Sequence, residues 1–175
     1  MKVKLLFFIS ICLFFLVLPK VGYAESNYVL PYPSFMPGTA LYKLHILYEH
    51  IQKYWYFGNF SQFSYNLNLS NKYLVEAKTL FEYKQYLLAH QALYKSNEYF
   101  TEAYRFLGRS KQEGKDTNQR VATLKNASEK HREVLWQIKT EIPEIYIWKP
   151  EKEKQTTLFL WKQIDKAIEI RKNSA

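Results

Sequence analysis

A long tract without proline constrains the fold of this chain more than any other feature. No proline occurs between Pro37 and Pro143, and glycine interrupts the tract at only four positions, Gly38, Gly58, Gly108 and Gly114. Because proline and glycine are the residues that most disfavour a helix interior, their scarcity permits long helices. Apolar residues in the tract recur at intervals of three and four, without the period-two alternation of strands. The tract therefore predicts an all-α fold.

The apolar positions fall into four runs, which predict four helices. The runs cover residues 41–55, 60–81, 86–107 and 121–142. Each keeps the three-four alternation of a heptad seam, which is typical of left-handed packing between helices. A weaker pattern over residues 160–168 predicts a final helix that docks on the others. The expected architecture is a four- to five-helix bundle with heptad-like seams.

The breaks between the runs predict how the helices are connected. Gly58 ends the first run, and the polar segment 108–116 is predicted to be the longest loop. The break near Lys84 contains neither glycine nor proline, but the apolar stripe shifts by five positions between Phe81 and Tyr86. This shift favours a tight helical hairpin; a single fused helix and a helical repeat of about 34 residues are the alternatives.

Three of the runs carry a serine near their middle, namely Ser70, Ser96 and Ser128. A small side chain at a seam position allows neighbouring backbones to approach closely, so we expect a narrow level in the bundle core at the serines. A polar ligand pocket at the same level is the alternative.

The first 24 residues have the pattern of an export signal. A basic start at Lys2 and Lys4 is followed by 14 largely apolar residues, 5–18, and then by small residues at Gly22 and Ala24. Fourteen helical residues span about 21 Å, short of the roughly 30 Å of a hydrocarbon core, which favours cleavage after Ala24 over a retained anchor. The chain therefore divides into four predicted parts: signal peptide 1–24, extended proline-rich lead 25–38, helical bundle 39–142 and C-terminal extension 143–175. We expect an exported protein that is periplasmic, on the cell surface or secreted.

Composition excludes several kinds of chemistry. Cys12 is the only cysteine and lies in the predicted signal, so residues 25–175 form no disulfide and hold no thiol nucleophile. Three of the 25 Lys and Arg residues and none of the 16 acids lie in the signal, which leaves 22 bases against 16 acids, a net charge of +6. This balance is compatible with an anionic envelope surface. Export and the dispersed basic residues argue against a nucleic-acid partner.

Aromatic residues are concentrated in the first part of the chain, with 21 between Tyr28 and Phe106. Most fall at helical spacing and are expected in the core. Four consecutive aromatics at 54–57 cannot all face one core, so they are candidates for an exposed contact surface. The candidate interaction residues are these aromatics and a basic group: Tyr54, Trp55, Tyr56, Phe57, Arg105, Arg109, Lys111 and Lys115.

The chain lacks the motifs of common catalytic sites. It has no Gly-x-Ser-x-Gly turn for a serine nucleophile and no glycine-rich loop for phosphate. A small-molecule or metal-binding bundle remains the alternative, and it requires four side chains to converge near the seam serines: His45, Glu49, His90 and His131. We expect no catalytic residue, no metal site and no cofactor.

The proline-rich lead carries a family resemblance. Leu30-Pro-Tyr-Pro33 is followed by Met36-Pro-Gly-Thr-Ala-Leu-Tyr42, in which Thr39 is the predicted N-cap of the first helix. This opening resembles that of a bacterial extracytoplasmic helical domain of unknown function that follows a signal peptide or membrane anchor. Other similar segments lie at residues 57–60, 67–77, 130–135, 141–144 and 167–169. Ala40 and Gly58-Asn59 depart from the family pattern, which has proline at the first helical position and Asp-Pro at the break.

The resemblance implies a helical fold outside the cytoplasm and supplies no catalytic residue, because the family has no established activity. The expected function is that of an exported, non-enzymatic accessory or sensor module for protein–protein or envelope-surface interaction. Its partner is an unknown protein or envelope component, with peripheral membrane contact as one form of binding. The oligomeric state stays open.

Overall fold

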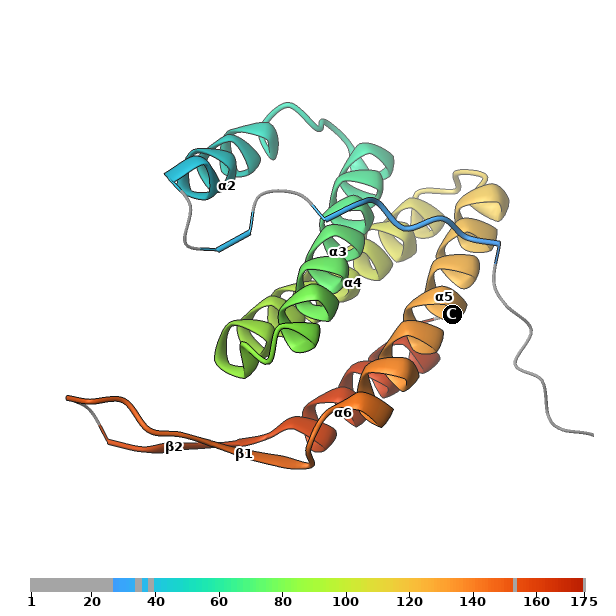
Figure 1. Ribbon diagram of the computed structural model, residues 1–175. Helices are drawn as coiled ribbons and strands as arrows, with labels where there is room; N and C mark the ends of the chain where they lie inside the picture. Colours follow the sequence, from blue (N-terminus) through green and yellow to red (C-terminus); the bar gives the residue numbers. More distant parts are fainter. Residues whose placement is uncertain (1–26, 34–35, 38–39, 153, 175) are drawn as a thin grey trace, which may run out of the picture.

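A computed structural model describes residues 27–33, 36–37, 40–152 and 154–174 (Figure 1). The predicted signal peptide and the predicted N-cap Thr39 lie outside the described residues. Within the described part of the chain, no helix is both long and apolar enough to cross a bilayer.

The predicted all-α fold is confirmed. The described residues form five helices, α2 (Ala40–Gln52), α3 (Asn59–Glu82), α4 (Tyr86–Gln112), α5 (Asn118–Glu141) and α6 (Leu160–Asn173), with two short strands, β1 (Ile145–Trp148) and β2 (Thr156–Phe159). The long helices α3 and α4 form one hairpin, and α5 and α6 pack beside it (Figure 1). α2 lies to one side of α3, outside the four-helix core, and contacts it through side chains (Figure 1).

The core lies between α3, α4, α5 and α6, as the seam pattern predicts. Its larger cluster includes Leu74, Leu93, Leu135 and Ile164, all fully buried. A second cluster near the other end of α3 includes Phe63, Phe100, Ala103 and Leu124. The seams predicted over residues 60–81 and 86–107 are therefore buried except at their first positions, Phe60 and Tyr86, which are half-buried. The seam over 121–142 is buried except at its first position, Val121, which is exposed.

The α3–α4 connection is the predicted tight hairpin. Lys84 adopts a positive φ of 59°, and the backbone N–H groups of Lys84 and Gln85 donate to the carbonyls of Phe81 and Leu80, both at 2.9 Å. This pair of bonds is the Schellman ending that usually employs glycine. Because a lysine occupies the left-handed position, this helix end cannot be recognised from glycine or proline in the sequence.

The predicted loop over residues 108–116 is wrong for its first half. α4 continues through Gly108 to Gln112, and only residues 113–117 connect it to α5. A glycine inside a helix costs about 1 kcal/mol relative to alanine, and the buried Leu107 and Ser110 on either side hold the helix against the bundle. Gly114, with a φ of 74°, is the glycine that ends the helix.

A small β-hairpin precedes α6, where the sequence predicted only a short apolar segment. β1 and β2 pair antiparallel, with Ile145 opposite Phe159 and Trp148 opposite Thr156. One face packs on the bundle, since Leu158 is buried and the Tyr146 ring lies 4.7 Å from that of Tyr86. The hairpin leads directly into α6, whose Leu160, Ile164 and Ala167 are part of the core. This confirms the predicted docking of the final helix.

Candidate functional site

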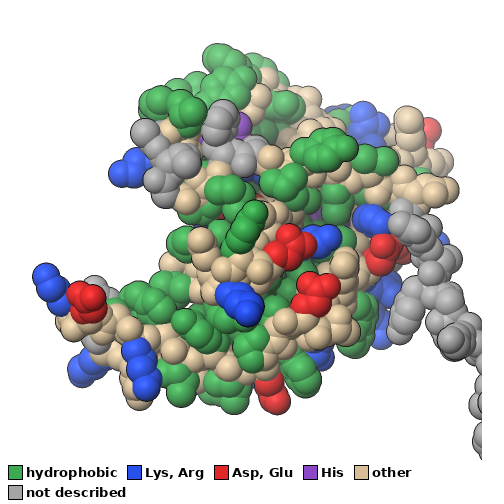
Figure 2. Space-filling view, viewed as in Figure 1, with side chains coloured by type: hydrophobic (Ala, Val, Ile, Leu, Met, Phe, Trp, Pro, Cys, Tyr) green, Lys and Arg blue, Asp and Glu red, His purple; other side chains and the backbone are tan. Residues whose placement is uncertain are grey.

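The apolar stripe of α2 faces solvent. Sequence periodicity predicted that the run at residues 41–55 packs into a bundle seam, and this prediction is wrong. Leu44 is 63% exposed, and other large apolar side chains of the helix are likewise exposed: Leu41, Leu47, Tyr48 and Ile51. Figure 2 shows hydrophobic side chains gathered over the end of the molecule where α2 lies.

Polar contacts on the opposite side of α2 explain this orientation. Glu49 is only 3% exposed, and its carboxylate accepts hydrogen bonds from Lys72 Nζ at 2.5 Å and from the Tyr73 hydroxyl at 2.9 Å. The Tyr65 hydroxyl donates to the Glu49 carbonyl oxygen at 2.8 Å. A rotation of α2 that buried its leucines would break these bonds. Polar groups of α3 would then be buried without hydrogen-bond partners, which costs free energy.

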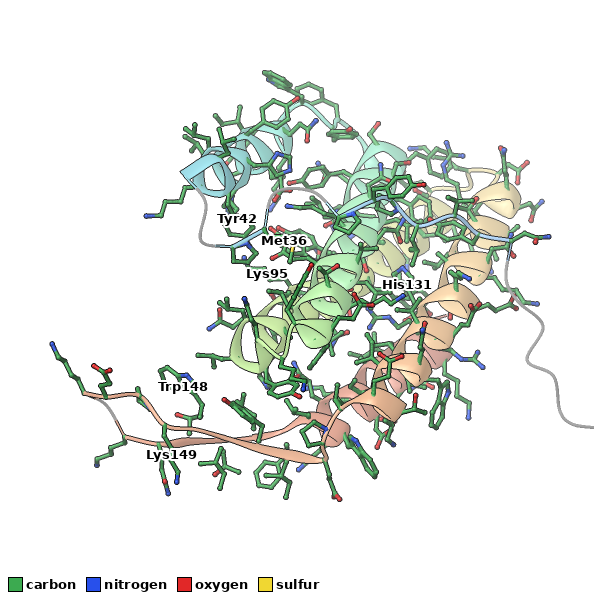
Figure 3. All side chains as sticks on the ribbon, in the orientation of Figure 1. Met36, Tyr42, Lys95, His131, Trp148 and Lys149 are labelled. Carbon is green, nitrogen blue, oxygen red and sulfur yellow. The ribbon has the colours of Figure 1, made fainter. Side chains whose placement is uncertain are left out.

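A second contact attaches the start of α2. The Tyr42 hydroxyl donates to Glu76 Oε1 at 2.9 Å. In Figure 3 the labelled Tyr42 lies below the ribbon of α2, on the same side as Lys95 of α4. Burial and the nearby Glu76 raise the pKa of Tyr42, while burial and Glu49 raise the pKa of Tyr73. Burial also raises the pKa of Glu76, against the opposing effect of its hydrogen bond from Tyr42. Both phenols are therefore protonated donors that fasten α2 to the bundle.

The aromatic residues after α2 divide between solvent and core. Phe57 is 81% exposed, and Tyr54 and Trp55 are exposed as well. Tyr56 turns inward, where its ring lies 5.1 Å from that of Tyr65. Gly58 has a φ of 82°, a conformation that L side chains rarely adopt, and it redirects the chain into α3. Three of the four predicted contact aromatics thus extend the exposed stripe of α2.

The exposed stripe and the aromatic turn form one surface, called here the apolar face. It consists of Leu41, Leu44, Leu47, Tyr48, Ile51, Tyr54, Trp55 and Phe57. The exposed charged groups in residues 41–57 are basic, namely Lys43 and Lys53. Glu49, the only acid in this stretch, is buried and bonded. The face is therefore apolar with a basic border.

The predicted basic group lies around the end of α4, and its four side chains are exposed. Arg105 pairs with Glu102, and both Arg105 and Arg109 lie over the Phe106 ring. Lys115 pairs with Glu113 at 2.7 Å and lies over the Phe60 ring at the start of α3. The α4–α5 turn thus reaches the same end of the bundle as the aromatic turn, but these cations do not converge on one point.

The seam serines meet at a polar layer in the core. Ser70 and Ser96 each donate to the backbone carbonyl of the other at 2.9 Å, and the Ser128 hydroxyl donates to the carbonyl of Arg171 at 2.7 Å. Arg171 is fully buried. Its guanidinium donates to Ser96 Oγ at 2.8 Å, to His131 Nδ1 at 3.2 Å and to Asn97 Oδ1. The alternative of a ligand pocket at this level is wrong, because the chain's own Arg171 fills it.

His131 is part of the same layer. Its Nε2–H donates to Asn71 Oδ1 at 2.7 Å, and the Asn71 amide donates to the Tyr28 hydroxyl of the lead at 2.8 Å. Burial and the charge of Arg171 lower the pKa of His131 well below its usual range, so the imidazole is neutral. Burial lowers the pKa of Arg171 to about 9, which leaves it cationic at neutral pH.

The role of Arg171 was not predicted from the sequence, although its spacing from Ile164 indicates a buried position. A basic residue in the last helical turn is normally solvated and favourable there. Arg171 nevertheless lies seven positions after the buried Ile164, on the same side of α6. Among the described residues, no carboxylate lies within ion-pair distance of it, and its partners are neutral groups and the face of the Phe100 ring.

The four candidate ligands of the small-molecule or metal alternative do not converge. His45 pairs with Glu49 at 3.1 Å on α2, His131 lies in the core, and His90 lies in a separate groove. No group of three or more potential metal ligands occurs among the residues that the structure describes.

The open groove that contains His90 has a volume of about 920 Å³. It runs along α4, with β2 and α6 as its other wall, and His50 of α2 and Tyr73 of α3 also line it. Tyr94, Tyr99 and Phe159 contribute rings to its lining. Gln163 also lines it, and its Nε2 donates to the His90 carbonyl oxygen at 2.8 Å. The Oε1 of Gln163 is buried and has no hydrogen-bond partner.

A family model matches residues 34–145, which is more than half of the chain. The chain belongs to the family described as domain of unknown function DUF5667. No curated protein and no solved structure gives a significant match. The matched span contains α2 to α5 and ends at the first residue of β1, so α6 and Arg171 lie outside it. Membership of a family without a known function is confirmed; the motif in the lead and the bacterial, extracytoplasmic setting stay predictions.

Proposed function

We propose that this DUF5667 protein is an exported, non-enzymatic interaction module that binds its partner through the apolar face. The observation that carries the proposal is the reversed orientation of α2, whose polar side is buried and whose apolar side is exposed. Contiguous exposed apolar surface is unusual on a monomeric soluble protein and marks interaction sites. Covering it gains roughly 25 cal/mol for each Å² of apolar surface removed from water.

The titratable groups with shifted pKa values support a non-enzymatic role. Such groups often mark active sites, but four of those shifted here, Tyr42, Tyr73, His131 and Arg171, have bonded partners that give them a structural role. Tyr73 holds α2 through Glu49, and Tyr42 does so through Glu76. His131 and Arg171 bond to each other in the core and are fully buried.

The groove along α4 supports a second candidate function, the binding of a small molecule. The observation that favours it is the groove itself, whose volume and lining by Tyr94, Tyr99 and Phe159 are typical of ligand pockets. Replacement of Tyr94 by alanine should then abolish ligand-induced stabilisation in a screen of small extracellular solutes. A melting temperature that no solute raises would remove this candidate.

Envelope binding tests the first candidate with a matched pair of variants. Ile51 on the apolar face and Val121 on α5 are 46% and 47% exposed, so glutamate at either position should leave the fold intact. We expect Ile51→Glu to abolish co-sedimentation of the purified protein with isolated cell envelopes and Val121→Glu to preserve it. Equal binding by both variants would contradict the proposal.

A further inference from the structure

We propose that the apolar face binds the surface of an anionic lipid bilayer, with α2 lying in the plane of the interface. The inference deepens the proposed function, since it rests on the same face as the contact surface and names what covers it. Its supports are the residue types of the face, the sign of the charges around it and its position in the chain.

The residue types of the apolar face fit the boundary between lipid headgroups and acyl chains. Helices that lie in this boundary carry aliphatic and aromatic residues on one side and basic residues beside them. Leu41, Leu44, Leu47 and Ile51 supply the aliphatic stripe of α2. Tyr48, Tyr54 and Trp55 add the amphipathic rings that concentrate at headgroup level.

The charges around the face fit an anionic surface. Lys43 and Lys53 are exposed in the same stretch as the apolar residues. The one acid of the stretch, Glu49, is withdrawn into the bundle and bonded to Lys72 and Tyr73. Beyond the aromatic turn, Lys115 and Arg120 lie over the ring of Phe60. Basic residues held near an anionic leaflet each strengthen binding to it.

The same charges disfavour a second copy of this chain as the occupant. In a two-fold symmetric dimer the same patch meets itself. Two apolar faces packed together would bring Lys43 and Lys53 of both copies to one interface, while the only acid of the stretch is already bonded within each copy. Like charges placed together in this way oppose association. A bilayer presents the complementary charge over its whole surface.

The position of α2, shortly after the predicted export signal, also favours a membrane as the occupant. Only residues 25–39 separate the predicted export signal from Ala40, the first residue of α2. Fifteen extended residues span at most about 50 Å. On the prediction of export, the apolar face is among the first parts of the protein to emerge beside the bilayer.

Vesicle binding by the purified exported protein tests the inference. The probes are vesicles of pure phosphatidylcholine and vesicles with about one third phosphatidylglycerol. We expect the anionic vesicles to bind at least about tenfold more tightly and the binding to weaken with added salt. Ile51→Glu should reduce binding at least about tenfold, because it places a charge in the apolar face. Val121→Glu should leave it unchanged.

Two further readouts keep the result interpretable. Circular dichroism and thermal melts should be the same for both variants, because each replaced side chain is about half exposed in the wild-type fold. Trp55→Phe should remove the fluorescence change that vesicles produce. Trp136→Phe should retain it, because Trp136 lies on α5.

Each contrary outcome has a distinct meaning. Envelope binding that requires Ile51, combined with no binding to either kind of vesicle, would overturn the lipid inference and leave the interaction module with a protein partner. Dimers that disappear in Ile51→Glu, without vesicle binding, would assign the face to a second copy and overturn it as well. Absence of binding to both envelopes and vesicles would overturn the inference together with the proposed function.

Discussion

The helices α2 and α6 flank the same helical core, and opposite sides of them are buried. α6 places Leu160, Ile164 and Ala167 in the core, all fully buried, together with the cation of Arg171. α2 buries Glu49 and leaves its leucines in solvent. Both helices are amphipathic in sequence, so amphipathicity alone does not determine which side of a helix faces the protein.

The difference lies in what the neighbouring helices present. α3 offers Lys72, Tyr73 and Glu76 to α2, and these groups need polar partners. α4 and α5 offer α6 an apolar cluster with a polar layer at one level. An element held by apolar burial shares the cooperative stability of the core, whereas one held by a few polar contacts can open by itself. The comparison predicts that changes on α6 weaken the whole fold and that changes on α2 stay local.

Matched truncations on the two helices should give the largest contrast. Ile164→Ala removes fully buried methyl groups from the core, so we expect it to lower the free energy of unfolding by about 2–5 kcal/mol. Leu44→Ala removes a similar side chain from solvent and should change that free energy by less than about 0.5 kcal/mol. Urea denaturation followed by circular dichroism measures both. Similar losses from the two variants would break the comparison.

The α6 side of the molecule should also be sensitive to acid. His131 is held neutral in the folded protein because burial and Arg171 lower its pKa. Below about pH 6.5 the unfolded chain binds a proton at this position and the folded protein does not, so stability falls as pH falls. The loss between pH 7 and pH 5 can reach about 2 kcal/mol.

Urea denaturation at the two pH values measures this loss, and His131→Gln should reduce it. His90→Gln, which lies away from the polar layer, should reduce it less, since burial lowers the pKa of His90 at a position that is only half-buried. An equal pH dependence in wild type and His131→Gln would show that the polar layer is not the source.

Sequence could predict the parts of the fold in which the apolar stripe of each helix packs into the core. The seams of α3 and α4 fill the core, and their period gives the buried positions directly. Periodicity failed for α2 because it locates an apolar stripe without giving the direction in which the stripe faces. The strands β1 and β2, at four residues each, are too short for alternation to stand out.

The candidate site was predicted in part for a similar reason. Four consecutive aromatics can be recognised as partly exposed from spacing alone, and Tyr54, Trp55 and Phe57 are exposed. The apolar face as a whole could not be foreseen, because it depends on Glu49 finding donors on a different helix. Arg171 was missed because its partners, Asn97 and His131, come from two other helices.

Removal of the Glu49 carboxylate should release α2 without unfolding the bundle. Glu49→Ala leaves Lys72 Nζ and the Tyr73 hydroxyl without their acceptor, which costs about 1–3 kcal/mol of local stability. We expect hydrogen exchange to accelerate at least about tenfold in α2 and to stay unchanged in α4 and α5. Mass spectrometry of peptides from each helix gives this readout. Faster exchange throughout the molecule would show that α2 belongs to the cooperative core.

The smallest change in stability is expected from an ion pair between α5 and α6. Like the contact of Glu49 it joins a lysine to a carboxylate, but here the carboxylate is exposed. Lys139 of α5 donates to Asp165 Oδ1 of α6 at 2.6 Å, and Asp165 is exposed. Exposed pairs contribute about 0–1 kcal/mol, so Asp165→Asn should lower the free energy of unfolding by less than about 0.5 kcal/mol, and salt should diminish even that. Denaturation at low and high salt measures the change. A loss as large as that from Ile164→Ala would mean that α6, like α2, is held by charge, and the distinction between the two helices would fail.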